Sequence, residues 1–260
     1  MIRVLIRKLG MASFSAMVLA APVLSLGAQS ASEWVSRGDA AYTARNAAAA
    51  VGDYQKALAE DPNNYEALWR ASRSQVDLAS AESNADRRSA MYKTAQEWAA
   101  HAVQVNPAAP DGHFVLAEAL GRMALTMGAR DRVKYAGNVR DQALACLKAE
   151  PTHAGCLHIM GVWNAEVMRL NGITRLIARN FLGGQIFGEA SWANARKYLE
   201  QAVTNDPRRI VHRLDLAKVY ADMGLTARAR TQYEAVVSGE LLDYNDPSYK
   251  AEAAAALKKL

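Results

Sequence analysis

The sequence of 260 residues has only two cysteines and four phenylalanines, and it lacks the short motifs that mark common catalytic or metal sites. It contains no HExxH, GxSxG or CxxCH motif and no glycine-rich phosphate loop. The histidines occur singly, and a single helical histidine is typical of a hydrogen-bonded structural residue. These absences argue against an enzyme and predict no metal or cofactor. The histidines are His101, His113, His153, His158 and His212.

Phenylalanine is scarce because much of the hydrophobic content, 51% of the chain, is alanine. Small side chains suit closely packed helices better than a sheet. Charged residues make up 22% of the chain, so the composition is not that of a disordered protein. A chain of this length can bury a sizeable core.

Residues 1–30 have the layout of a secretory signal peptide. Three basic residues precede an apolar run, residues 9–26, and small residues follow it. We expect cleavage between Gly27 and Ala31, and a mature chain in the periplasm or secreted. The alternative is a membrane anchor that stays attached, although two serines and Pro22 interrupt a run already short for a bilayer. No later run is long enough to span a membrane, so we expect the mature chain not to be transmembrane.

Removal of this segment changes the charge balance. The whole chain carries a formal net charge of +5, but without the three basic residues of the segment it has 28 basic and 26 acidic residues. The excess of positive charge therefore lies mostly in the peptide to be removed, and the sequence predicts no nucleic-acid partner.

The two cysteines lie ten positions apart, on either side of the Glu150–Pro151 turn. In an oxidising compartment Cys146 and Cys156 are a possible disulfide, since adjacent antiparallel helices can bring them together. The alternative is a pair of small buried thiols in the core. Sequence alone leaves both open.

One pattern, residues 54–62, returns three times, at residues 97–107, 143–151 and 198–207. Each copy closes with an acidic or amide residue followed by proline, which stops a helix because it lacks an N–H group. The prolines are 45, 44 and 56 residues apart. This period predicts stacked helix pairs.

The first of these units resembles the tetratricopeptide (TPR) pattern W-x2-L-G-x2-Y…A-x3-F…P, with two departures at Arg37 and Ala41. We expect the small residues to let the paired helices approach closely, and the two rings to fill the gap between units. The matching positions are Trp34, Gly38, Ala50, Tyr54, Ala57 and Pro62.

The sequence therefore predicts an all-α fold, a TPR-like α-solenoid of about five helix pairs with a C-terminal capping helix. The second helix of the third pair is expected from about residue 138 to 149, after a basic turn at residues 130–132. The predicted domain is 31–260, with units at about 31–64, 65–109, 110–153, 154–209 and 210–243 and a cap at 244–260.

Several stretches resemble one particular family of TPR proteins. They are residues 68–73 (LWRASR), 92–99 (YKTAQEWA), 161–163 (GVW) with Glu166, 175–178 (RLIA) and 195–207. With them the whole mature chain resembles the TPR domain of the regulator of microtubule dynamics family. That resemblance implies a helical interaction domain at organelle membranes, tied in some members to phospholipid binding or transfer.

The concave wall of such a solenoid is lined mainly by the first helix of each pair. Aromatic rings beside arginines suit a peptide carboxylate or a phosphate. The alternative is structural, in which Arg70, Arg73, Glu118 and Glu166 pair with one another and hold successive helices in register. The predicted wall residues are Tyr42, Trp69, Arg73, Phe114, Glu118, Arg122, His158 and Glu166.

An insertion, residues 169–188, interrupts the fourth unit. Apolar residues recur in it at helical spacing, with Arg175 and Arg179 on a different face, so the segment is a candidate for facing lipid or covering a ligand. The alternative is that the stripe packs on its neighbours. The candidate lipid-facing residues are Ile173, Leu176, Ile177, Phe181, Ile186 and Phe187.

Together these features predict a non-catalytic scaffold that binds a protein or peptide partner in the cell envelope through its concave surface. The alternative function is a phospholipid-binding or lipid-transfer domain.

Overall fold

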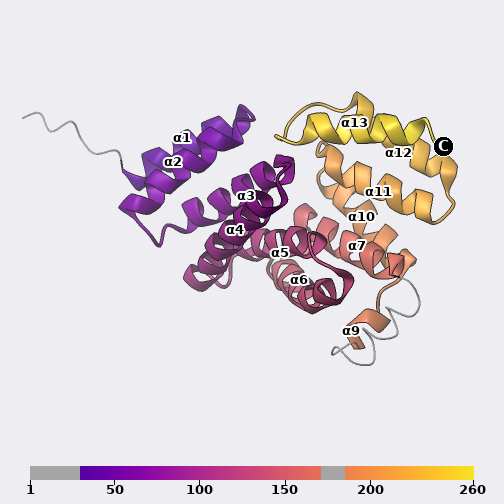
Figure 1. The fold of residues 1–260 in the computed structure, drawn as a ribbon, viewed down its shortest axis with the longest axis horizontal. Coiled ribbons are helices and arrows are strands. Elements are labelled where there is room, and N and C mark those ends of the chain that lie inside the picture. The colour runs from indigo at the N-terminus through magenta and orange to yellow at the C-terminus, as the bar shows by residue number, and fades with distance from the viewer. Residues whose placement is uncertain (1–29, 171–184) are drawn as a thin grey trace, which may run out of the picture.

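The computed structural model describes residues 30–170 and 185–260, and all regular structure in those ranges is helical (Figure 1). None of the helices in these ranges is both long and apolar enough to cross a membrane. The helices are α1 (Ala31–Thr43), α2 (Ala47–Glu60), α3 (Tyr65–Ala81), α4 (Ala85–Val105), α5 (Pro110–Leu125), α6 (Ala129–Ala149), α7 (Ala154–Arg169), α9 (Gln185–Gly188), α10 (Trp192–Asn205), α11 (Ile210–Asp222), α12 (Thr226–Ser238) and α13 (Asp246–Leu257).

The long helices form successive pairs, α1 with α2, α3 with α4, α5 with α6, α7 with α10 and α11 with α12. The final helix, α13, packs on α12 and α11. The pairs follow one another along an arc, so that the last ones curve back toward the first (Figure 1). The predicted all-α solenoid of five helix pairs and a C-terminal helix is confirmed.

The recurring proline pattern marks the end of the second helix in each of the first four pairs. The capping residues are Asp61, Asn106, Glu150 and Asp206, and each is followed by proline. Each donates its backbone N–H to the carbonyl four residues earlier and then leaves the helical conformation. A residue before proline is disfavoured in the α region, because the proline ring collides with it. The helices therefore stop where the sequence pattern places them.

Close packing within the first pair depends on Gly38. A Cβ atom at that position would lie 2.3 Å from the ring of Tyr54, which is fully buried. The Tyr54 hydroxyl donates a hydrogen bond to Asp39 Oδ1 at 2.8 Å. Trp34, expected between units, instead lies half-buried on the first pair with the Lys56 ammonium 4.3 Å from its ring centre.

Helix α6 differs from the prediction, since it begins at Ala129 and not near residue 138. The charged residues 130–132, expected to form a turn, belong to its first turns. The helix is held there because Val133 and Val139 are both buried in the core, at 5% and 6% exposure.

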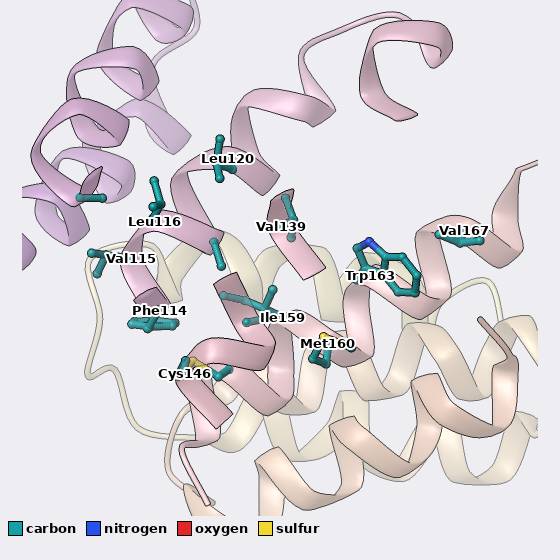
Figure 2. Close-up of a cluster of buried hydrophobic side chains, with 14 of the residues drawn as sticks. Phe114, Val115, Leu116, Leu120, Val139, Cys146, Ile159, Met160, Trp163 and Val167 are labelled. Carbon is teal, nitrogen blue, oxygen red and sulfur yellow. A yellow bond between two sulfur atoms is a disulfide. The ribbon is translucent and has the colours of Figure 1, made fainter. Parts of the chain in front are cut away.

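The largest core cluster lies between α5, α6 and α7 (Figure 2). Phe114 and Leu120 of α5 meet Ile159 and Trp163 of α7 in it (Figure 2). A disulfide joins Cys146 of α6 to Cys156 of α7, with a Cα–Cα distance of 6.4 Å, and both residues are fully buried. In the structure, therefore, the third and fourth pairs are also linked covalently.

The connection between α12 and α13, residues 239–245, reaches back to the first two pairs, and we refer to it as the closing segment. Asp243 Oδ1 accepts hydrogen bonds from Arg209 Nη2 at 2.9 Å and from the Tyr42 hydroxyl at 3.3 Å. The Asn245 amide donates to the Asp77 carbonyl at 3.1 Å. These contacts join residues as much as 201 positions apart in the chain and close one side of the solenoid.

Replacement of Gly161 tests the packing between α7 and α10. A Cβ there would lie 2.5 Å from Leu199 Cγ, so we expect Gly161→Ala to lower the free energy of unfolding by about 1–3 kcal/mol. In the control Gly52→Ala the new methyl group meets no atom within 4 Å, and we expect no change or a gain of up to about 1 kcal/mol. Chemical denaturation measures both; equal stabilities would contradict the packing.

Removal of the disulfide should destabilise the protein through the unfolded state. For a loop this short, we expect the double variant Cys146→Ala, Cys156→Ala to lose about 2–3 kcal/mol in urea denaturation, because its unfolded chain is less constrained. Reductant should lower the stability of the wild-type protein toward that value and leave the variant unchanged. A wild-type protein indifferent to reductant would refute the expectation.

Candidate binding pocket

The first helices of the pairs line a pocket of about 160 Å³ on the concave side. Helix α6, the closing segment and α13 complete its wall. The lining residues include Tyr42 (α1), Arg73 (α3), Glu118 (α5), Arg132 (α6), His158 (α7), His212 (α11), Asp243 (closing segment) and Tyr249 (α13).

The structure brings together seven of the eight predicted wall residues in this pocket. Trp69 is not among the lining residues. Its indole N–H donates to Glu66 Oε2 at 3.0 Å, and the Arg73 guanidinium carbon lies 5.0 Å from its ring centre. The seven are Tyr42, Arg73, Phe114, Glu118, Arg122, His158 and Glu166.

Arg73 lies over an aromatic ring of α1, that of Tyr42. Its guanidinium carbon is 3.7 Å from the ring centre of Tyr42, a cation–π distance. Its Nε atom is buried and has no hydrogen-bond partner. Burial, and next the charge of Asp77, raise the pKa of the Tyr42 hydroxyl, so that this group stays protonated at neutral pH.

Asp77 lies one turn after Arg73 on α3. Its Oδ1 accepts from the Asn245 amide at 3.2 Å, whereas its Oδ2 is buried without a partner. Burial, and then the nearby carboxylates of Glu118 and Asp243, raise the pKa of Asp77 to about 7. A substantial fraction of Asp77 is therefore protonated at neutral pH.

A second polar group lies where α7 faces α11. The His158 ring nitrogen Nε2 is 2.8 Å from Asp215 Oδ2, and Lys218 Nζ is 3.0 Å from the other oxygen. Burial alone would raise the pKa of Asp215, but Lys218 and His158 outweigh it and hold the pKa well below its usual range. The carboxylate is ionised and fully paired.

His212 lies against this group with its ring centre 4.8 Å from that of His158. It is 2% exposed, and neither ring nitrogen has a hydrogen-bond partner. Burial, and then the neighbouring His158, lower its pKa well below the ordinary value. His212 is thus a neutral ring that lines the pocket with its hydrogen-bonding capacity unused.

Glu166 belongs to an ionic chain that joins three helices. It lies 3.8 Å from Arg132 Nη1 of α6 and 2.7 Å from Arg169 Nη1 of α7. Arg169 in turn bonds Asp222 of α11 at 2.6 Å. This part of the wall has a structural role.

The predicted register network among Arg70, Arg73, Glu118 and Glu166 is not present in the structure. Arg70 instead pairs with Asp39 Oδ1 at 2.9 Å and with Glu66. Among the described residues, Arg73 and Glu118 form no ion pair within 4 Å. Charged contacts do hold successive helices together, but through other partners.

The predicted lipid-facing insertion lies mostly outside the described residues, as do Ile173, Leu176, Ile177, Phe181 and the side chain of Ile186. Phe187 does not fit that role. It is 3% exposed and stacks on Trp163 with ring centres 6.0 Å apart, because its large ring completes the core beside α7.

The other histidines have structural partners. His101 Nε2 lies 2.8 Å from Asn63 Oδ1, and His113 lies between Gln142 at 2.7 Å and a carbonyl at 2.9 Å. His153 caps α7 by accepting from the Cys156 N–H. Of the five, only His212 lacks a hydrogen-bond partner among the described residues.

Sequence reasoning missed several residues that line the pocket. Asp77 stands four positions after Arg73 on α3, and His212 and Asp215 lie at the start of α11. Projecting all of α3 and α11 onto the concave wall would therefore have found these three residues. Asp243 and Tyr249 have no such signal, because they lie in the closing segment and in α13; Arg209 caps the start of α11 and pairs with Asp243.

A protein-family model described as regulator of microtubule dynamics protein 1-3 matches residues 34–260. The chain belongs to this family. No curated protein matches the chain.

Two solved structures are similar in fold to this family member. One is TTC0263, a TPR protein of Thermus thermophilus, with a TM-score of 0.60 and 21% identity over 86% of this chain and 99% of that one. The other is PilF of Pseudomonas aeruginosa, with a TM-score of 0.48 and 14% identity over 88% of this chain and 90% of that one. The first supports the TPR-type fold.

The pKa of Asp77 predicts a pH dependence of stability. An unfolded aspartate ionises near pH 4, but Asp77 keeps its proton until about pH 7, so the native state is progressively disfavoured between these values. We expect the wild-type protein to lose on the order of 2 kcal/mol more than Asp77→Asn between pH 5 and pH 8. Denaturant titrations at both pH values measure this; parallel pH profiles would exclude it.

Proposed function

We propose that this protein is a non-catalytic binding module that takes a segment of a protein or peptide partner into its concave pocket. The observation that carries the proposal is a preformed pocket with hydrogen-bonding atoms left unused. These atoms are Arg73 Nε, Asp77 Oδ2, Glu118 Oε2, Arg132 Nε and both ring nitrogens of His212.

Unused donors and acceptors support binding of a polar ligand, because a buried polar atom without a partner costs free energy that a ligand can recover. The pocket offers donors and acceptors together, as a peptide main chain requires. Phe114 and Trp163 add apolar surface beside them. The arrangement favours a peptide segment over a simple anion.

The arrangement of polar groups also supports binding rather than catalysis. Among the described residues of the pocket, His158 is hydrogen-bonded to the Asp215 carboxylate, whose other oxygen is paired with Lys218. Within residues 30–170 and 185–260, no serine, threonine or cysteine is hydrogen-bonded to His158 as a group that it could activate. The export signal expected in residues 1–30 extends the proposal to a partner in the cell envelope.

Phospholipid binding is the second candidate, supported by membership of a family in which some members have been tied to phospholipids. The pocket favours it less, because Asp77 and Glu118 would face the phosphate and about 160 Å³ is small for two acyl chains. Native mass spectrometry of the purified protein separates the two: a co-purifying phospholipid mass supports the lipid candidate.

A variant that fills the pocket tests the proposal. Gly121 lines the pocket on α5, and a Cβ there meets only Val139 at 3.9 Å, so Gly121→Leu should occupy the pocket without disturbing the helix. We expect immobilised wild-type protein to capture a partner from the envelope fraction. The amount of partner captured by Gly121→Leu should be lower by a factor of about ten or more.

The matched control is Gly52→Leu, which adds the same side chain on α2 where a Cβ meets no atom within 4 Å and no pocket residue lies. It should capture the partner as the wild-type protein does. Equal capture by Gly121→Leu and Gly52→Leu, with both folded by circular dichroism, would exclude the pocket as the partner site.

A further inference from the structure

Most charges around the pocket are already neutralised by a neighbour. Asp243 is paired with Arg209, Asp215 with His158 and Lys218, and Glu166 with two arginines. Because their charges are already compensated, these groups attract a charged ligand only weakly. Among the described residues, the charged lining groups without an ion pair are Arg73 and Asp77 of α3 and Glu118 and Arg122 of α5; Arg73 already lies over the Tyr42 ring, and Asp77 accepts from Asn245.

Glu118 and Arg122 stand four positions apart on α5, with the acidic residue first. That spacing and order normally produce an ion pair on a helix. Here, among the described residues, no ion pair within 4 Å joins the two side chains and no hydrogen bond reaches Arg122, although the charge of Glu118 still acts on the guanidinium; Glu118 Oε2 is buried without a partner. The pocket thus keeps an acceptor and a guanidinium fork side by side and unused.

Apolar side chains line the pocket next to this pair. Phe114 is one turn before Glu118 on α5, and Ile159, Val162 and Trp163 come from α7. The volume of about 160 Å³ is close to that of a dry engineered cavity that admits benzene. One apolar side chain of moderate size therefore fits.

The closing segment restricts how a chain can enter. Asp243 bonded to Tyr42, and Asn245 bonded to Asp77, tie the end of the fifth pair to the first two pairs along the pocket edge. A polypeptide lying straight through the pocket would have to displace these bonds. A chain end, or a small molecule, would not.

We propose that the pocket recognises a terminal amino-acid unit, with its α-carboxylate on Arg122, the nitrogen of the same residue donating to Glu118, and its apolar side chain against Phe114, Ile159 and Trp163. The inference rests on the proposed function, since it names what enters the same pocket. A guanidinium can hold a carboxylate through two parallel hydrogen bonds. The unit is either the C-terminal residue of a partner or a free amino acid, because both have this carboxylate and nitrogen.

Ligand-observed NMR titrations of the full chain test the carboxylate first. The probes are N-acetylglycyl-leucine and the same compound with a C-terminal amide. We expect the acid to bind about tenfold or more tightly than the amide, because the amide loses a charge-assisted pair. Equal binding of acid and amide, or binding of neither, would overturn the proposal.

Arg122→Gln should lose the preference for the acid, whereas Arg230→Gln, at an exposed position of α12, should keep it. If Arg122→Gln does not fold, Arg122→Lys replaces it; it keeps the charge without the fork, and we expect a partial loss. An unchanged preference in a folded Arg122 variant would refute the role of that residue.

A titration with free L-leucine distinguishes a free amino acid from the C-terminal residue of a partner. Tighter binding of leucine than of the acetylated peptide, weakened further by Glu118→Gln, assigns the pocket to a free amino acid, whose ammonium needs the carboxylate. Tighter binding of the peptide assigns it to a partner's C-terminus.

If acid and amide bind equally while Gly121→Leu still abolishes partner capture, the present inference fails and the proposed function stands. If Gly121→Leu still captures the partner but no longer binds the acid, the proposed function fails and the inference about the terminal unit stands.

Discussion

The bonds from Arg209 and Tyr42 to Asp243 close one side of the inner face of this molecule. A stack of helix pairs alone is a curved surface open along its length. Here the segment before α13 returns to α1 and α3, so the inner face becomes a pocket with walls on several sides. Asp77, whose pKa is raised by burial, is one of the residues that the closing segment covers.

The fold could be predicted well because its signals are local. Proline after a polar cap stops a helix wherever it occurs, and Gly38 opposite Tyr54 allows two helices to approach closely. The predicted start of α6 was wrong for a local reason as well. The charged residues 130–132 resemble a turn in sequence, yet arginine is a good helix former. Burial of Val133, the next residue, holds this first part of α6 against the core, so the helix already begins at Ala129.

The pocket was predictable only in part. A projection of the first helices placed Phe114, Glu118 and Arg122 on one wall, because residues four apart share a helix face. It could not show that no ion pair within 4 Å joins Glu118 and Arg122 among the described residues, since this spacing ordinarily indicates a pair. Nor could it find Asp243, whose position depends on a contact 201 residues away in the chain. Phe187 looked exposed in sequence because only the tertiary stack on Trp163 buries it.

Contact between the first and last pairs also changes how the protein resists unfolding. In an open repeat array each unit touches only its neighbours, so the terminal units open independently and at low free energy. The bond from the Tyr42 hydroxyl to Asp243 joins the first pair to the segment after the last pair and turns that line into a loop. Loosening of the N-terminal pair then breaks a contact beside α13, which couples the opening of the two ends of the array.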